Sequence, residues 1–115
     1  MFNINMKKKL RKIIINSMIF WWKADWFYHF DDRRIIRVRI WGSDKKGQPL
    51  YVNLTYKWVE YLVYSSYLKP KDIAAIIEYA LSHGWHPFIR RTAPYWLKQD
   101  VDHLILDNFV LTNIC

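Results

Sequence analysis

Cysteine and glycine are scarce in this 115-residue sequence, and each scarcity removes a class of function. The one cysteine, Cys115, is the last residue, so the chain can form neither an intramolecular disulfide nor a cysteine metal cluster. The three glycines form neither a Gly-x-Ser-x-Gly nucleophile elbow nor a phosphate-cradling loop. We therefore expect a protein of the reducing cytoplasm that is not an enzyme, with no catalytic residues, no cofactor and no small-molecule substrate.

A long apolar run is also missing. The segment 13–22 is apolar except for Asn16 and Ser17, and it follows a basic run, so it resembles the start of a signal peptide. Its length is about half of the roughly 20 residues that a membrane-spanning helix needs, so we expect no transmembrane segment. We interpret residues 1–22 as an amphipathic helix lying on the domain or on a partner, and we keep a position on an anionic membrane surface, a flexible tail and a signal-like segment as open alternatives.

Acidic residues are absent from the first twelve positions, which carry five of the net eight positive charges. A basic tail of this kind solubilises a protein or binds polyanions weakly, and it leaves the body of the chain only mildly basic. A chain of this length fits one domain. We expect a basic N-terminal segment at 1–17, one α+β domain at 18–106 and a C-terminal tail at 107–115.

The clearest element that is present is a helix at 70–83. Pro70 suits the first helical position, and Asp72 places a negative charge in the first turn. Gly84 suits the left-handed position after the last turn, and Pro87 prevents the helix from resuming. The apolar residues between these signals repeat with a helical period and form one stripe: Ile73, Ile76, Ile77, Ala80 and Leu81.

Two alternating segments, 34–41 and 50–56, flank a polar turn and predict an antiparallel hairpin. The apolar set predicts the inner face of the hairpin, which packs against the helix and consists of Ile36, Val38, Ile40, Leu50, Val52 and Leu54. The other set predicts the outer face and consists of Arg37, Arg39, Trp41, Tyr51, Asn53 and Thr55. The fold class is therefore α+β, a small single domain with an antiparallel sheet packed against an amphipathic helix.

The remaining segments give weaker signals. Residues 56–68 are rich in β-formers but lack turn residues, so a short helix and a longer second strand both stay open, with the helix favoured because a 13-residue strand would be long. A short strand is expected at 95–98, followed by a last helix containing Val101, Leu104 and Ile105.

Several motifs resemble those of small bacterial proteins of unassigned function. They are Gly-Gln-Pro-Leu-Tyr-Val in the hairpin, Leu-Lys-Pro-Lys-Asp-Ile at the start of the helix, Tyr-Ala-Leu-Ser-His-Gly-Trp-His-Pro at its end, and the Tyr-Trp-Leu strand. The resemblance covers about residues 34–98. It implies a single α+β domain and no particular activity.

Histidines near the end of the helix raise the question of a metal site. His83 and His86 lie on either side of the helix stop, so they do not share a helix face as an i, i+4 pair of zinc ligands would. A histidine near a helix C-terminus also has a structural role, because its charge complements the helix dipole. We expect no metal.

Aromatic residues make up 18% of the chain, too many for all of them to lie in the interior, which indicates a binding surface. We predict a protein-binding module of the interaction or immunity-like kind, whose partner is another protein or a second copy of the chain. A nucleic-acid-binding protein that uses the sheet face and the basic N-terminus is the alternative. The candidate binding residues are Arg37, Arg39, Trp41, Tyr51, Trp85, Arg90 and Arg91.

Overall fold

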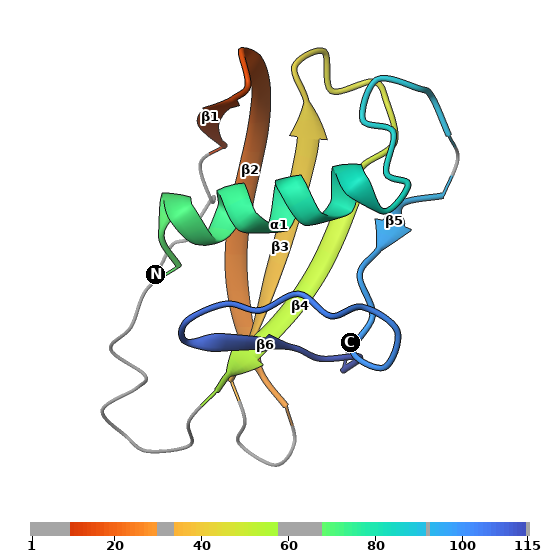
Figure 1. Ribbon diagram of the computed structural model, residues 1–115. Helices are drawn as coiled ribbons and strands as arrows, with labels where there is room; N and C mark the ends of the chain where they lie inside the picture. Colours follow the sequence, from red (N-terminus) through yellow and green to blue (C-terminus); the bar gives the residue numbers. More distant parts are fainter. Residues whose placement is uncertain (1–9, 30–33, 58–67, 92, 115) are drawn as a thin grey trace, which may run out of the picture.

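One helix crosses one side of a mixed sheet in the computed structural model (Figure 1), which describes residues 10–29, 34–57, 68–91 and 93–114. The predicted α+β fold is confirmed, and it forms a single domain with a six-stranded sheet. The elements in chain order are β1 (Arg11–Ile15), β2 (Met18–Tyr28), β3 (Arg34–Gly42), β4 (Leu50–Tyr56), α1 (Pro70–Ser82), β5 (Tyr95–Trp96) and β6 (Phe109–Leu111).

The first four strands pair in chain order and antiparallel to one another. The far edge of β4 is shared by the two short strands: β5 pairs in parallel with Leu50 and Tyr51, and β6 pairs antiparallel with the other end of β4. The predicted hairpin is confirmed as β3 and β4. The strand expected at 95–98 is present as β5, which contains two residues.

The helix begins and ends where the sequence signals predict. Pro70 is the first helical residue, and the carboxylate of Asp72 accepts a hydrogen bond of 2.9 Å from the Lys69 N–H, which satisfies a donor that the helix leaves unpaired. After α1, Gly84 has a φ of 113°, a backbone conformation that residues other than glycine rarely adopt.

The core lies between α1 and the inner face of the sheet. All six side chains predicted for the inner face are buried, and they cluster with the stripe of α1 that includes Ile73, Ile76 and Ile77, each of which is 0% exposed. At about 25 cal/mol per Å² of apolar surface removed from water, burial of this kind is the main force that holds a helix against a sheet. The helix side of the sheet is therefore not accessible to a partner where α1 covers it.

The prediction of an amphipathic helix at residues 1–22 is wrong for the part of this segment that the structure describes. Residues 11–28 form the hairpin of β1 and β2, joined by a two-residue turn in which Asn16 and Ser17 have φ values of 51° and 67°. The two polar residues are therefore the turn itself, since a tight hairpin turn needs positive φ at both positions and asparagine tolerates it. The isoleucines and aromatics on either side favour strands because they are β-branched or aromatic.

The sheet extends past the bounds 18–106 expected for the domain. Strand β1 lies in the segment expected as a basic N-terminal extension, and β6 lies in the segment expected as a tail. The helix favoured at 56–68 falls mostly on residues outside the part of the chain that the structure describes. Tyr56, its first residue, belongs to β4.

The prediction of a last helix containing Val101, Leu104 and Ile105 is also wrong. Residues 99–101 form a turn and residues 102–106 have no regular structure, while Val101 and Ile105 are 62% and 83% exposed. The Asp102 carboxylate accepts a hydrogen bond of 2.7 Å from the Lys98 N–H, which caps this single turn. In the described part of the chain, no helix has both the length and the apolar character needed to cross a membrane.

Candidate binding face

The side of the sheet opposite α1, which we call the outer face, collects four of the seven predicted binding residues. Side chains alternate between the two faces of a strand, so the residues of β3 and β4 that do not point toward α1 point to the outer face. Register then places them in rows across the strands, with Lys23 opposite Arg39 and Arg39 opposite Tyr51. The next row aligns Asp25, Arg37 and Asn53.

These rows surround one open hollow of about 270 Å³. Its lining combines three cations, one carboxylate and two aromatic rings, so its charge is positive and its walls are partly apolar. The six lining residues are Lys23, Asp25, Arg37, Arg39, Trp41 and Tyr51. Arg37, Arg39, Trp41 and Tyr51 were singled out from the sequence, and the structure brings all four together.

The arginines of the outer face rest on aromatic rings. The guanidinium carbon of Arg39 lies 4.1 Å from the centroid of the Tyr51 ring and 5.5 Å from that of Trp96, and Tyr51 and Trp96 contact each other edge to face. The guanidinium carbon of Arg37 lies 4.2 Å from the Phe27 ring centroid. Each contact of this type contributes about 0.5–1 kcal/mol at an exposed site and restricts the position of the charge.

Asn53 helps to fix the position of the Arg39 side chain. Its side-chain oxygen accepts a hydrogen bond of 3.3 Å from Arg39 Nη1, which also donates to the Val38 carbonyl at 2.9 Å. Its Nδ2 donates to the Ile114 carbonyl at 2.9 Å, so the end of the chain lies against this residue. Asn53 was expected on the exposed surface, but only 2% of it is exposed, and it supports the face without being part of its accessible surface.

The other three predicted binding residues do not join the outer face. Trp85 is 1% exposed, its ring lies 5.8 Å from that of Phe20, and its Nε1 donates a hydrogen bond of 2.8 Å to the Gln48 carbonyl. The structure therefore places Trp85 in the core. Arg90 and Arg91 are exposed in the loop that follows α1 and do not line the hollow.

Sequence reasoning missed the contribution of β2 to the face. Lys23 and Asp25 line the hollow, and Phe27 lies beneath Arg37, yet all three follow a segment that was interpreted as helical. The sequence does contain a signal for this strand, because the apolar residues Trp22, Ala24 and Trp26 alternate with the charged residues Lys23 and Asp25.

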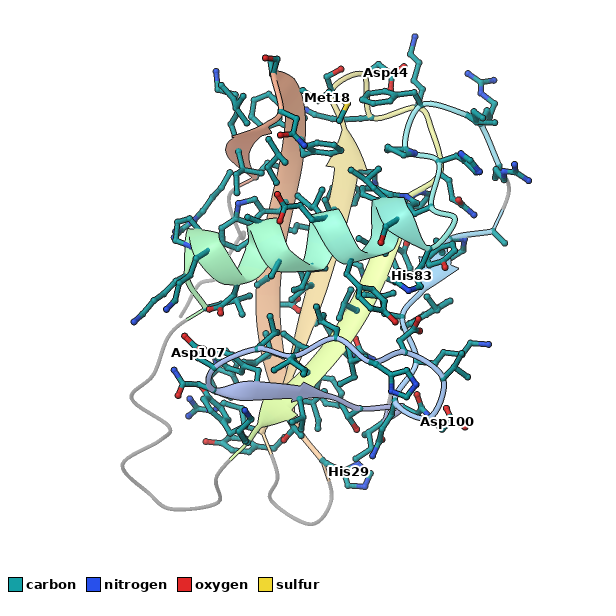
Figure 2. The ribbon with its side chains drawn as sticks, viewed as in Figure 1. Met18, His29, Asp44, His83, Asp100 and Asp107 are labelled. Atoms are coloured by element: carbon teal, nitrogen blue, oxygen red, sulfur yellow. The ribbon has the colours of Figure 1, made fainter. Side chains whose placement is uncertain are left out.

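His83, one of the two histidines considered as metal ligands, has a structural role at the end of α1. His83 Nδ1 lies 2.8 Å from the Tyr79 carbonyl oxygen and 2.9 Å from Ser82 Oγ, and the rings of His83 and Tyr79 stack with their centroids 3.9 Å apart. Asp100, an acid that follows these histidines in the sequence and could have joined them at a metal, lies in the loop between β5 and β6, well apart from His83 at the end of α1 in Figure 2. Among the described residues, no group of three or more histidines, cysteines or acids could hold a metal ion.

The pKa shifts that the structure shows lie outside the hollow. A hydrogen bond of 2.7 Å between Lys71 Nζ and Asp107 raises the pKa of Lys71 and lowers the pKa of Asp107. Burial raises the pKa of Tyr95, whose hydroxyl donates to the His83 carbonyl. The Lys71–Asp107 pair is exposed to solvent, so it adds little to stability.

Comparison with known proteins gives no relative for this chain. No family model matches it, and no curated protein and no solved structure is significantly similar to it. Its function has to be inferred from the outer face and the rest of the structure.

Proposed function

We propose that the protein is a non-enzymatic protein-binding module, of the interaction or immunity-like kind, whose outer face contacts an acidic surface of a partner protein. The single observation that supports this most is the gathering of Arg37, Arg39, Trp41 and Tyr51 around one hollow on the side of the sheet that α1 does not cover. Aromatic residues and arginine are the types that dominate the energy of protein interfaces. We place the module in the bacterial cytoplasm, where its lone thiol stays reduced.

A different protein is a better partner than a second copy of the chain. The hollow carries three cations and one carboxylate, so two copies placed face to face would bring like charges together. An acidic partner instead gains both attraction and faster association. A homodimer through this face is therefore disfavoured, and sedimentation of the purified protein would detect it.

Single-stranded nucleic acid is the weaker candidate because of how the rings are used. A stacking platform needs open aromatic faces on which bases can lie. Here the guanidinium groups of Arg37 and Arg39 lie over the rings of Phe27 and Tyr51, at 4.2 and 4.1 Å from the centroids. These covered faces are not available for stacking, whereas the cations on top of them suit carboxylates.

Replacing Trp41 with alanine tests the proposal. We expect it to weaken partner binding by about 2 kcal/mol, because a large aromatic side chain is lost from the wall of the hollow. The matched control is Trp26→Ala, which removes a tryptophan that is 49% exposed and does not line the hollow. Affinity capture from nuclease-treated lysate of the producing cells, with wild type and both variants, measures the effect after circular dichroism has shown that the variants fold.

The proposal requires proteins that wild type and Trp26→Ala capture and that Trp41→Ala loses. The same proteins captured by all three baits, or capture that occurs only when the nuclease is left out, would contradict it. Sedimentation of the purified protein adds the remaining case, since a dimer that dissociates in Trp41→Ala would make the second copy the partner.

A further inference from the structure

Two loops meet at the end of the sheet where β3 ends and β4 begins (Figure 1). One is 43–49, which joins β3 to β4, and the other is 83–91, which follows α1. Gln48 connects them, because its N–H donates a hydrogen bond of 2.9 Å to the Ile89 carbonyl and its carbonyl accepts one of 2.8 Å from Trp85 Nε1. The two loops therefore form one surface with fixed geometry, which we call the loop tip.

Two neighbouring apolar side chains of the loop tip are exposed to solvent. Phe88 is 46% exposed and Ile89 is 50% exposed. The centroid of the Phe88 ring lies 6.2 Å from that of Phe20, so part of this ring rests on the core. The backbone of Ile89 is held by two hydrogen bonds, one donated to the His86 carbonyl and one accepted from the Gln48 N–H. A partner that removes this apolar pair from water gains free energy in proportion to the area covered.

The loop tip is also strongly positive. Asp44, which Figure 2 labels at this end of the sheet, is the one acidic residue of the two loops, and its carboxylate accepts a hydrogen bond of 3.0 Å from the Lys46 N–H. Within the described part of the chain, the side chains of Lys46, Arg90 and Arg91 form no ion pair. Four exposed cations thus accompany the two apolar side chains: Lys45, Lys46, Arg90 and Arg91.

From this arrangement we propose that the loop tip binds the surface of an anionic lipid bilayer. Phe88 and Ile89 enter the boundary between headgroups and acyl chains, and the cations pair with negative charges of the headgroups. A lipid surface fits better than nucleic acid, because a phosphate backbone offers no apolar layer for an exposed isoleucine. The inference is independent of the proposed function, since the residues that line the hollow of the outer face do not belong to the loop tip.

Co-sedimentation of the full chain with lipid vesicles measures this binding. The probe is a vesicle of equal parts of phosphatidylcholine and phosphatidylglycerol at physiological salt, and the reference is a vesicle of phosphatidylcholine alone. We expect binding to the neutral vesicle to be weaker by at least about tenfold, since each cation near an anionic surface contributes about fivefold. The basic residues 7–12 are present in every variant, so the loop tip is tested by comparing variants.

The apolar contribution is tested with Ile89→Ser, because Phe88 also packs on the core. We expect Ile89→Ser to weaken binding to the anionic vesicle by about fivefold, the effect of losing the apolar contact of half a side chain. The matched control is Ile105→Ser, the same change at an isoleucine that is 83% exposed in the loop between β5 and β6. The control should change the affinity by less than about twofold, as is usual for an exposed position away from a binding site.

The charge contribution is tested with the double variant Arg90→Gln, Arg91→Gln. We expect it to weaken binding to the anionic vesicle by at least about tenfold. The matched control is Lys71→Gln, Lys98→Gln, which removes two positive charges from the start of α1 and from the chain after β5. It should weaken binding by less than about threefold, because salt screens exposed charges that lie away from the membrane contact.

A polarity-sensitive dye separates insertion into the lipid from attraction by charge alone. Cys115 is the one cysteine of the chain, so a Cys115→Ser background allows a single nitrobenzoxadiazole label through either Ile89→Cys or Ile105→Cys. We expect the label at position 89 to brighten and shift to shorter wavelength when anionic vesicles are added, and the label at position 105 to stay unchanged. Circular dichroism shows first that each variant folds.

Each outcome decides the question. Losses confined to the loop-tip variants, with a dye response at position 89 alone, support the proposal. Equal losses in variants and controls, no binding to anionic vesicles, or binding without a dye response at position 89 would overturn it. Tighter binding of a fluorescent oligothymidylate that depends on Arg90 and Arg91 would assign the loop tip to nucleic acid, and protein capture that depends on Ile89 without vesicle binding would assign it to a protein partner.

Discussion

Replacing Ile76 with aspartate should strongly destabilise the domain and sharply lower its melting temperature. Ile76 is 0% exposed and lies in the middle of the α1 stripe, against the buried residues of the inner sheet face. A carboxylate forced into this site would be buried without a partner, which places the substitution among those that cost more than about 4 kcal/mol. The whole domain has only about 5–15 kcal/mol of stability, so this loss removes a large part of it and strongly lowers the melting temperature.

Thermal unfolding followed by circular dichroism measures this effect. Ile105→Asp is the matched control, because it makes the same chemical change at a side chain that is 83% exposed, and its melting temperature should stay close to that of wild type. An unchanged melting temperature in Ile76→Asp would mean that the helix stripe is exposed to solvent and that the core lies elsewhere.

Trp85→Ala should lower the free energy of unfolding by about 3–5 kcal/mol, the usual cost of removing a large aromatic side chain from a core. The side chain is 1% exposed and packs against Phe20, and its loss also leaves the Gln48 carbonyl without the indole donor. Trp26→Ala, at a tryptophan that is 49% exposed, should cost less than about 1 kcal/mol.

Chemical denaturation of the two variants gives the difference directly. The sequence pointed to Trp85 as a binding residue, and this experiment separates the two roles. A variant of normal stability that fails to capture the partner would restore Trp85 to the binding surface, whereas a large loss of stability would confirm its place in the core.

Local signals that agreed with one another predicted the central part of the fold. The helix was bounded by Pro70 and Gly84, and the alternation of 34–41 and 50–56 assigned every inner-face residue correctly. Four residues of the candidate site followed from that alternation alone. These features depend on neighbours close in the sequence, which is why they could be found without a structure.

The features that the sequence did not reveal depend on how the strands pair and on contacts between residues that are distant in the sequence. Residues 1–22 were interpreted as an amphipathic helix, and only the pairing of β1 with β2 shows that Asn16 and Ser17 form a hairpin turn. Burial of Asn53 depends on the end of the chain, through Ile114, and burial of Trp85 depends on Gln48, 37 positions earlier. Contacts of this length leave no local pattern.

The positive charges of the outer face have fixed positions, which distinguishes this face from a basic tail. Arg37 and Arg39 are positioned by rings and by hydrogen bonds, so they lose less freedom when a partner binds than lysines on an exposed segment would.

Amide chemical-shift mapping tests most directly whether the outer face is the binding surface. Nitrogen-15 labelled protein is titrated with N-acetyl-hexaglutamate amide at physiological salt, and the shifts are compared along the chain. We expect the largest changes around Lys23, Arg37, Arg39, Trp41 and Tyr51, on three neighbouring strands, and little change in α1. Changes confined to the basic residues 7–12, or centred on α1, would contradict the assignment of binding to this face.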